Sequence, residues 1–358
     1  MRLAFLLGSV IFVLTTAISA DQETEKKPVE CDDPKYKKTW EEALIKYPLP
    51  KNATELIFQY SFPDEKLAEQ EIFLWASTDI AMNNQRQIYV LDQRSKHILE
   101  FDQAGSYLRT IGREGHGPGE MAVPLCVCSS DESIYVIDNG NRNILRYTFD
   151  GNFIESKKTA KSYSDMVWDP SGYIYAAPIF GPPEQYLVDV LDAKGEYIKS
   201  IIKPNDTVLS LPRQIPVVTF LGFDGKRNLY VAFQYYPVVI KSDTDGAKIE
   251  EFKIENKIMK EQANTNLDYA SNKLARAVSI IERIQGRMGG GFYILHRSPR
   301  TEILEFDADG KMIHDYWHTK LCNYRASGFI VDEKNGKFYF NQLYPEFKID
   351  VFLPKESK

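Results

Sequence analysis

The sequence predicts an all-β fold, a six-bladed β-propeller of four-stranded antiparallel blades, from three observations. An apolar residue followed by tyrosine opens a β-rich run six times along the chain. An aspartate-to-glycine turn follows most of these runs, and the two ends of the chain carry complementary parts of one blade. The six pairs are Ile88-Tyr89, Ile134-Tyr135, Ile174-Tyr175, Leu229-Tyr230, Phe292-Tyr293 and Phe338-Tyr339.

The repeat explains why the fold should be a ring. Successive tyrosines of these pairs are 40 to 63 residues apart, and a repeat of about 40–50 residues is typical of stacked units that cannot bury their own apolar faces. After each pair come a loop, a second β-rich run and a turn such as Asp150-Gly151. Aspartate caps such a turn and glycine adopts its positive φ, so these are hairpin signals. One more strand precedes each pair, as in residues 164–168, and radial four-stranded sheets form a propeller.

The ends of the chain predict how the ring closes. The last unit stops after three strands near residues 352–354, whereas residues 55–60 form a spare strand before the first unit. We expect this N-terminal strand to complete the last blade, because the pairing removes an exposed sheet edge. The alternative is that the strand is an addition to a ring that closes by side-chain packing alone.

The first twenty residues read as a signal peptide. Arg2 supplies a positive charge, Leu3 to Val13 is an apolar stretch, and small residues precede a cleavage site after Ala20. The apolar stretch is shorter than the ~20 residues of a membrane span, so an uncleaved anchor is the less favoured alternative. We therefore expect the mature protein to be secreted or periplasmic, with no membrane span after cleavage.

The remaining chain divides into three predicted parts. Residues 21–52 form an N-terminal segment with a short amphipathic helix at 35–46, and residues 53–354 form the propeller. Apolar residues at a nearly helical period predict a helical insertion at about 255–278. This insertion is either a helix on the surface or a lid beside the pore.

Composition restricts the class of function. The chain has 358 residues, of which 43% are hydrophobic and 26% charged, with a net charge of −6. These values are typical of a globular protein with a large core. A mildly acidic protein without a run of lysine or arginine is not expected to bind nucleic acid.

Four cysteines leave the disulfide pattern open. In an exported protein, Cys31 and Cys322 are the more plausible disulfide, because it would tie the N-terminal segment to the last blade. Cys126 and Cys128 lie two apart on one predicted strand, so a bridge between them would be strained. The alternative is four free, half-buried thiols.

Two stretches of the chain resemble a known family. The glycine-rich linker from Gly112 to Met121 and the string Asp138, Asn141, Arg142 and Ile144 resemble the NHL-repeat family of six-bladed propellers. Within that family, the chain is similar to exported bacterial six-bladed propeller proteins. The resemblance implies mainly the binding of protein, peptide or carbohydrate. A few related propellers are metal-containing lyases or lactonases, but no stretch here matches their catalytic motifs.

The topology predicts where a ligand should bind. The loops between the second and third strands of each blade share one face with the long connections between blades, which we call the pore-mouth face. Loops on a rigid scaffold are the usual place for binding residues. Arginine and tyrosine on this face suggest an anionic or carboxylate-bearing ligand. The alternative is that these are ordinary polar loop residues and that Arg142 joins two neighbouring blades. The candidate residues are Arg94, His97, Arg113, His116, Asn139, Arg142, Tyr235, Tyr236, His296, Arg297, Arg300 and Tyr344.

Metal binding is the second line of interpretation. Asp79 and Asp165 occupy similar places on the predicted innermost strands of two blades, where they could hold a cation in the channel. Solvation of the pore is the more common role of such residues. The histidines of the pore-mouth face lack ligand spacing, and exposed loop histidines are favoured over a zinc site. No cofactor is predicted, with calcium or zinc as the alternative.

The sequence favours a binding function over catalysis. No triad order, nucleophile elbow or phosphate loop occurs. We expect a monomeric binding scaffold for a protein, peptide or glycan. The alternative is a metal-dependent lyase or hydrolase with its centre in the propeller channel.

Overall fold

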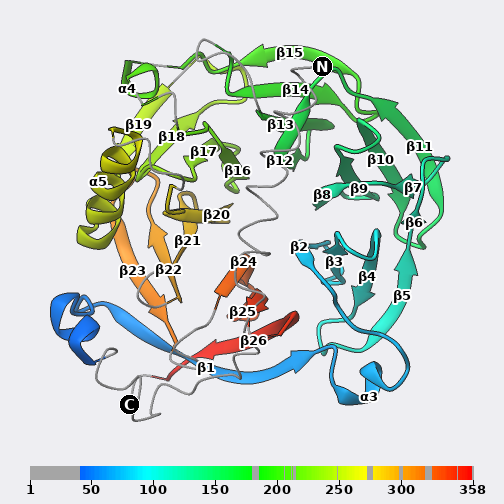
Figure 1. The fold of residues 1–358 in the computed structure, drawn as a ribbon, viewed down its shortest axis with the longest axis horizontal. Helices are drawn as coiled ribbons and strands as arrows, with labels where there is room; N and C mark the ends of the chain where they lie inside the picture. Colours follow the sequence, from blue (N-terminus) through cyan, green and yellow to red (C-terminus); the bar gives the residue numbers. More distant parts are fainter. Residues whose placement is uncertain are drawn as a thin grey trace.

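The computed structural model describes residues 41–356 apart from 180–184, 205, 211, 213–214, 248, 272–276, 298–300, 319–324 and 345. Its strands form sheets that stand around a central axis (Figure 1), so the fold is an all-β propeller. The predicted signal peptide and the first part of the predicted helix at 35–46 lie outside the described residues. No helix in the part of the chain that the structure describes is long and apolar enough to cross a membrane.

Four separate sheets contain four consecutive antiparallel strands each. The first contains β2 (Ser77–Met82), β3 (Ile88–Asp92), β4 (His97–Phe101) and β5 (Tyr107–Ile111). The second contains β8 (Pro124–Ser129), β9 (Ser133–Asp138), β10 (Asn143–Thr148) and β11 (Phe153–Lys158). The third contains β12 (Ser162–Asp169), β13 (Tyr173–Ile179), β14 (Val188–Asp192) and β15 (Tyr197–Ile201). The fourth contains β16 (Thr219–Phe223), β17 (Leu229–Phe233), β18 (Val238–Ser242) and β19 (Ile249–Lys253).

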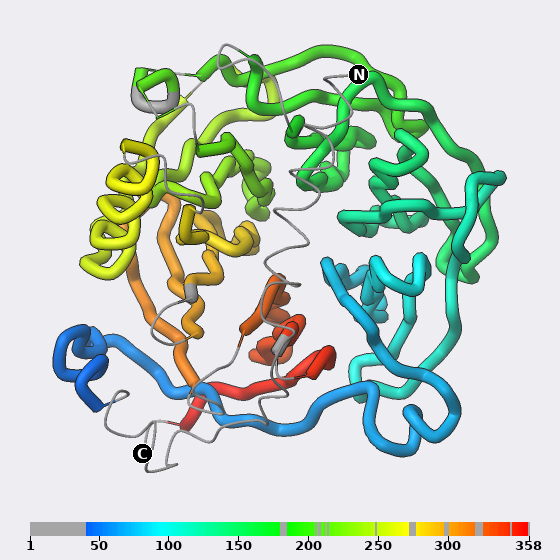
Figure 2. The backbone as a smooth tube through the Cα atoms, viewed as in Figure 1, coloured from blue at the N-terminus to red at the C-terminus, as the bar shows by residue number. Residues whose placement is uncertain are grey.

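The remaining large sheet has eight strands in the order β20-β21-β22-β23-β1-β26-β25-β24. One half contains β20 (Ile281–Gly286), β21 (Phe292–Arg297), β22 (Thr301–Phe306) and β23 (Met312–Trp317). The other half contains β24 (Arg325–Asp332), β25 (Lys337–Tyr344), β26 (Lys348–Pro354) and the N-terminal β1 (Ala53–Phe62). The predicted pairing of the N-terminal strand with the last strand is confirmed, because β1 runs antiparallel to β26 over Leu56 to Phe62 (Figure 2). A parallel bridge of three residue pairs between β1 and β23 joins the two halves.

The short elements lie at the edge of the ring. A two-stranded parallel ribbon, β6 (Arg113–Glu114) with β7 (Glu120–Met121), connects the first and second sheets. Short helices are α3 (Glu65–Ala68) and α4 (Asp206–Leu209), and residues 41–46 are also helical. The longest helix of the described residues, α5 (Lys257–Ser271), falls within the predicted insertion and lies against the side of the ring (Figure 1).

Two of the six repeated tyrosines join neighbouring sheets through their hydroxyl groups. All six are at most 5% exposed. The Tyr135 hydroxyl on β9 donates to the Ala193 carbonyl in the third sheet at 2.9 Å, and the Tyr175 hydroxyl on β13 donates to the Thr244 carbonyl in the fourth at 3.1 Å. Both acceptors lie in the aspartate-to-glycine turns of the next sheet, so at these two places the tyrosine and the turn form one inter-sheet contact. The hydroxyls of Tyr89 and Tyr230 bond within their own sheets, to Asn83 and Asp224.

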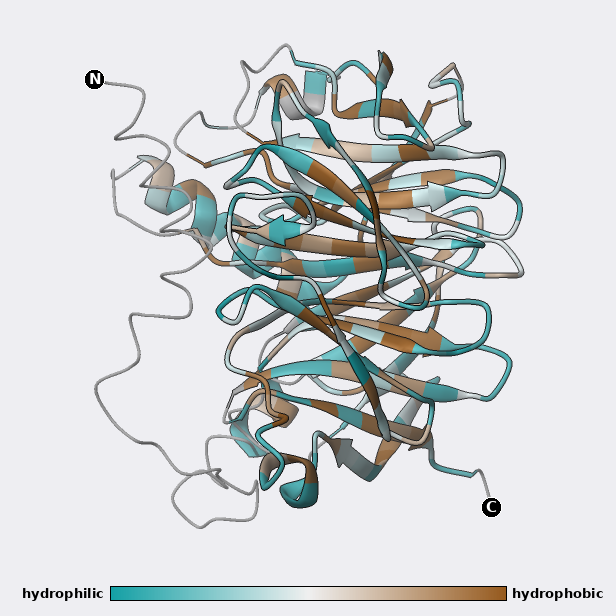
Figure 3. Cartoon of the chain, turned by 90° about the vertical axis from the view of Figure 1, so that its right-hand side faces the viewer, coloured by the Kyte–Doolittle hydropathy of each residue, from teal (hydrophilic) through white to brown (hydrophobic). Residues whose placement is uncertain are grey.

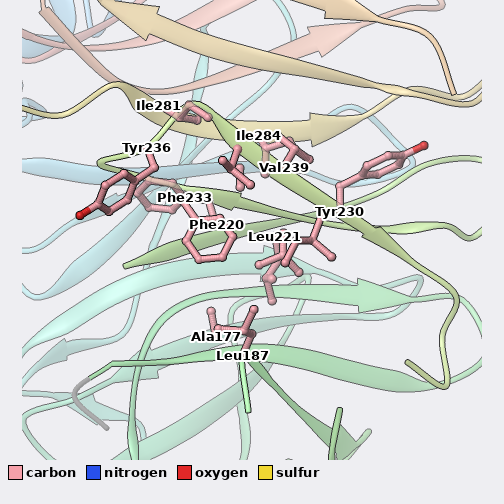
Figure 4. Packing of buried hydrophobic residues seen from close by; sticks show 14 of the residues in the cluster. Ala177, Leu187, Phe220, Leu221, Tyr230, Phe233, Tyr236, Val239, Ile281 and Ile284 are labelled. Atoms are coloured by element: carbon pink, nitrogen blue, oxygen red, sulfur yellow. The ribbon is translucent and has the colours of Figure 1, made fainter. Parts of the chain in front are cut away.

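Apolar side chains fill the spaces between sheets. Figure 3 shows hydrophobic residues along the strands and hydrophilic residues in many of the exposed loops. In the largest cluster, Leu221 and Tyr230 of the fourth sheet pack with Ile284 of the neighbouring β20 (Figure 4). Burial of apolar area of this kind is the main stabilising contribution to the ring.

Candidate functional site

The innermost strands surround the axis of the ring. Each of β2, β8, β12, β16, β20 and β24 contacts the next of these strands, and β24 contacts β2, so they form a closed cycle (Figures 1 and 2). Side chains on their inner face therefore meet although they are far apart in sequence. We call the space that they border the channel.

Strand register identifies one equivalent position in each of these strands. On the second strand of each sheet, we take the residue two positions after the repeated tyrosine, and the equivalent position is its partner on the innermost strand. In the first sheet, Leu91 follows Tyr89 by two positions and pairs with Asp79. A β-bulge precedes this position in every innermost strand except β16, and bulges typically redirect a side chain near a functional site. The six equivalent residues are Asp79, Cys126, Asp165, Phe220, Arg283 and Gly328.

The two channel carboxylates bind neighbouring strands with one oxygen each. Asp79 Oδ2 accepts the backbone N–H of Val127 at 3.0 Å, and Asp165 Oδ2 accepts that of Leu221 at 2.7 Å. The other oxygens face further channel residues. Asp165 Oδ1 accepts the Cys126 thiol at 3.2 Å, and Asp79 Oδ1 lies 3.5 Å from Arg283 Nε. These four side chains form what we call the channel cluster.

Burial controls the charges of the channel cluster. Asp79 and Asp165 are each 6% exposed and Cys126 is 1% exposed. Burial raises the pKa of the Asp165 carboxyl, Arg283 opposes the rise and Asp79 adds to it. Burial and the two carboxylates also raise the pKa of the Cys126 thiol, which is therefore protonated in the absence of a cation. A buried group of ionisable side chains with shifted pKa values is a candidate functional site.

Arg283 supplies the positive charge of the cluster. Its guanidinium lies 4.5 Å from the centre of the Phe220 ring and its side chain is 14% exposed. The 3.5 Å distance to Asp79 is short enough for an ion pair but longer than a normal N–H···O hydrogen bond. Among the described residues, Nε has no hydrogen-bond acceptor.

Three of the candidate pore-mouth residues lie in the interior, and a fourth, Asn139, is half-buried. Tyr235 and Tyr236 are 7% and 6% exposed. His296 is fully buried, with Nδ1 2.7 Å from Glu302 and Nε2 3.0 Å from Gln262 of α5. The Asn139 side chain donates to the Tyr163 carbonyl and accepts its N–H, which joins the second and third sheets. His296 and Asn139 have structural partners and the two tyrosines are buried, so these four residues do not form an open binding surface.

The other candidates divide into two groups. Arg94, Arg113, His116 and Arg142 are exposed on the loops of the first two sheets, and His97 is half-buried there. Burial lowers the pKa of the His97 imidazole, and Asp92 partly opposes this shift. The Arg300 residue and the side chains of Arg297 and Tyr344 lie outside the described part of the structure. Cys31 and Cys322, the predicted disulfide, also lie outside it, whereas Cys126 and Cys128 are buried free thiols.

Exposed aromatic surface accompanies Arg94. Trp75, in the connection before β2, is 47% exposed, and the Arg94 guanidinium lies 4.8 Å from the centre of its ring. Phe73 packs against the Trp75 ring edge-on at 4.8 Å. The fully buried Asp92 carboxylate accepts the backbone N–H groups of both Trp75 and Arg94. The Trp75–Arg94 pair is therefore held on a rigid support.

The second sheet repeats this support without the pair. Its Asp138 carboxylate accepts the backbone N–H groups of Ala122 at 2.9 Å and Gly140 at 3.1 Å. These two positions correspond to Trp75 and Arg94 of the first sheet. The backbone arrangement thus forms equally well with small residues, so it does not require a tryptophan or an arginine.

Sequence reasoning missed Cys126 and Arg283 in the channel and Trp75 at the pore mouth. The repeat spacing could have identified Cys126 and Arg283, since each of the six equivalent residues lies nine to eleven positions before its repeated tyrosine. Trp75 belongs to a connection between sheets, which no repeat describes.

Comparison with solved structures defines the class as a β-propeller. A member of the DUF4221 family from Bacteroides vulgatus has a TM-score of 0.58 at 13% identity, covering 86% of this chain and 99% of that one. A Bacteroides fragilis protein named as exported has a TM-score of 0.55 at 12% identity, covering 86% and 99%. Virginiamycin B lyase from Staphylococcus aureus has a TM-score of 0.51 at 12% identity, covering 78% and 94%.

The family follows from the sequence itself. The model of DUF4934, a domain of unknown function, matches residues 66–277, which is more than half of the chain. The chain belongs to the DUF4934 family. No curated protein sequence matches it.

Proposed function

We propose that the protein is an exported, monomeric, six-bladed propeller of the NHL-like type. It binds a protein, peptide or glycan by recognising an acidic group of that ligand. The six blades are the four separate sheets and the two halves of the eight-stranded sheet. Export, to the periplasm or the exterior, agrees with the signal-like first twenty residues and with the exported Bacteroides fragilis neighbour. The binding surface is the pore-mouth face of the first two sheets.

One observation carries this proposal, the exposed Trp75–Arg94 pair on its rigid support. Tryptophan and arginine are the residues most often found at the energetic centres of interfaces. A tryptophan ring stacks on apolar or sugar surfaces, and an arginine binds carboxylates with two parallel hydrogen bonds. The equivalent positions of the second sheet, Ala122 and Gly140, show that the fold alone does not need these side chains.

Neighbouring loops extend the basic surface. Gln93 of the β3–β4 loop donates to the Pro124 carbonyl at 3.1 Å, which joins the first sheet to the second. His116 lies 2.6 Å from Asn141 of the β9–β10 loop, and Arg113 forms an ion pair with Glu120 at 2.8 Å. Arg142 projects from the same loop and is exposed. An acidic ligand would meet the exposed guanidinium groups of Arg94 and Arg142 on this part of the face, whereas the charge of Arg113 is already paired with Glu120.

The test uses anionic and neutral polymers as probes. Affinity electrophoresis in gels containing polygalacturonate or dextran is run beside fluorescence anisotropy with a glutamate-rich peptide. Trp75→Ala and Arg94→Ala should each weaken binding to the anionic glycan or the acidic peptide by about tenfold, equivalent to ~1.4 kcal/mol. The neutral dextran should bind weakly to every variant.

Tyr197→Ala is the matched control, because Tyr197 is an aromatic residue 59% exposed on the outer strand of another sheet. It should leave binding unchanged. Unchanged affinity of the Trp75→Ala/Arg94→Ala double variant for every acidic probe would reject this surface.

A second candidate function, a metal-dependent lyase or hydrolase centred in the channel, is favoured by the convergence of Asp79, Cys126 and Asp165 on the axis. Removal of metal by a chelator should then abolish turnover, whereas it should not affect binding at the pore-mouth face.

A further inference from the structure

The channel cluster has the composition of a metal site. One ligand atom each from Asp79, Cys126 and Asp165 lies within 4.8 Å of the other two, and all three side chains are buried. We infer that these residues hold a divalent transition-metal cation of the Zn²⁺ type, with one coordination position open to the channel beside Arg283. This site is separate from the pore-mouth surface, and the inference does not depend on ligand binding there.

The distances agree with such an ion after a small inward movement. Zinc binds oxygen at ~2.0–2.2 Å and sulfur at ~2.3 Å, which places tetrahedral ligand atoms about 3.5 Å apart. Cys126 Sγ is already 3.2 Å from Asp165 Oδ1. The other pairs of ligand atoms, which involve Asp79, are at most 4.8 Å apart and need to approach by about 1 Å to bind one ion.

Both carboxylates have the support that metal ligands usually have. The N–H groups of Val127 and Leu221 each hold one oxygen of Asp79 and Asp165, and these donors belong to the adjacent innermost strands. Hydrogen bonds from outside the coordination shell orient ligands and contribute to metal affinity. The β-bulges before Asp79, Cys126 and Asp165 direct all three residues to the same level of the channel.

The thiol selects the kind of metal. Thiolate ligands favour zinc and related metals, whereas calcium takes six to eight oxygen ligands and magnesium keeps several waters. On binding, the Cys126 S–H bond breaks, its proton leaves to solvent, and a metal–sulfur bond forms. The two carboxylates and the thiolate then carry three negative charges, which the divalent cation and the Arg283 guanidinium balance.

Arg283 places a positive charge beside the open coordination position. Within the described structure its Nε has no hydrogen-bond acceptor, although the atom is buried and faces the cluster. Its ion pair with Asp79 Oδ1, at 3.5 Å, is longer than a normal hydrogen bond and leaves room for a closer acceptor. A metal-bound water, or a carboxylate oxygen of a channel ligand, would be an acceptor at this place.

The experiment uses the full mature chain, kept reduced, after removal of metal with a chelator. Cobalt(II) titration reports the ligands directly, because cobalt bound to thiolate absorbs in the near ultraviolet. We expect saturation at one cobalt per chain with this band, displacement of cobalt by zinc, release of about one proton, and no competition from a large excess of calcium.

Cys126→Ser should remove the near-ultraviolet band and weaken zinc binding more than the roughly 10–100-fold that loss of a supporting residue costs. Cys128→Ser is the matched control, since Cys128 is a buried free thiol two residues along the same strand, and it should keep both the band and the affinity. Asp79→Asn keeps the shape of the side chain and should weaken zinc binding while retaining the band.

Two results would overturn the inference. One is an identical response of Cys126→Ser and Cys128→Ser. The other is a wild-type chain that binds neither cobalt nor zinc and melts at the same temperature with and without zinc, in which case Arg283 alone would neutralise the carboxylates. The melting measurement needs no variant, so the inference remains testable even if a substitution prevents folding.

Discussion

Removal of one hydroxyl should measure how much the repeated tyrosines contribute to the joining of the sheets. The Tyr135→Phe substitution keeps the ring, which stacks on Trp168 at 5.6 Å, and removes only the hydrogen bond to the Ala193 carbonyl. Burial raises the pKa of Tyr135 to about 12, so the hydroxyl is a donor throughout the neutral range. Tyr135 is 1% exposed, and water cannot easily replace the lost donor.

The expected cost follows from these contacts. A net hydrogen bond contributes about 0.5–1.5 kcal/mol, and a carbonyl left unsatisfied adds to the loss, so unfolding should become easier by about 1–2 kcal/mol. Each kcal/mol corresponds to a fall in Tm of about 1.5 °C for a propeller of roughly 300 residues, because the unfolding entropy is ~2.1 cal/mol/K per residue. Urea unfolding followed by circular dichroism gives the free energy, with Tyr197→Phe as the control because its hydroxyl bonds Ser200 at the exposed surface. Equal stability of the wild type and Tyr135→Phe would refute the role assigned to the inter-sheet hydrogen bond of Tyr135.

Two further predictions concern the connection after the first sheet and a close approach between strands. The Glu120 carboxylate accepts the Gly117 N–H, which lowers its pKa below the usual 4.5. A lowered folded-state pKa means that this stabilisation is complete above pH 4.5 and is lost as the pH falls below it. Proteolysis of the 112–122 connection should therefore increase in acid for the wild type. The Glu120→Gln variant, which has no carboxylate to protonate, should not show this increase. A Cβ at Gly286 would lie 1.9 Å from a backbone oxygen of β16, whereas a Cβ at Gly289 would meet nothing within 4 Å. Gly286→Ala should therefore lower the free energy of unfolding by at least about 1–3 kcal/mol, and Gly289→Ala is its control.

Each of these two predictions has a clear contrary result. Proteolysis of the connection that increases equally in acid for the wild type and for Glu120→Gln would show that another group holds this loop. Equal urea midpoints for Gly286→Ala and Gly289→Ala would show that β16 and β20 can separate at no cost.

The repeat made the architecture predictable, because tyrosines and aspartate-to-glycine turns mark the same strands in every unit. The same periodicity could have placed Arg283 beside Asp79 and Asp165, since all three precede a repeated tyrosine by ten residues. The charge of Arg283 gives no such indication by itself, because only closure of the ring brings it near two carboxylates.

The pore-mouth residues were less predictable for a physical reason. The α5 insertion packs against the loops of the fourth sheet and of β21, where Asn266 donates to the Tyr235 carbonyl at 3.0 Å and Gln262 contacts His296. Loop residues that a regular propeller would expose are thus buried by a segment outside the repeat. The first two sheets have no such cover in the described structure, and there Arg94 and Arg142 are exposed as expected.

The position of β1 has a consequence for the order of events during synthesis. Its Glu55 forms an ion pair with Lys355, 300 residues later in the chain, and its hydrogen-bonding partners β23 and β26 are among the last strands to be made. The first strand to emerge must therefore wait, unpaired, until almost the whole polypeptide exists. Vectorial folding can complete the four four-stranded sheets one by one, but the eight-stranded sheet is complete only after β26 has been synthesised.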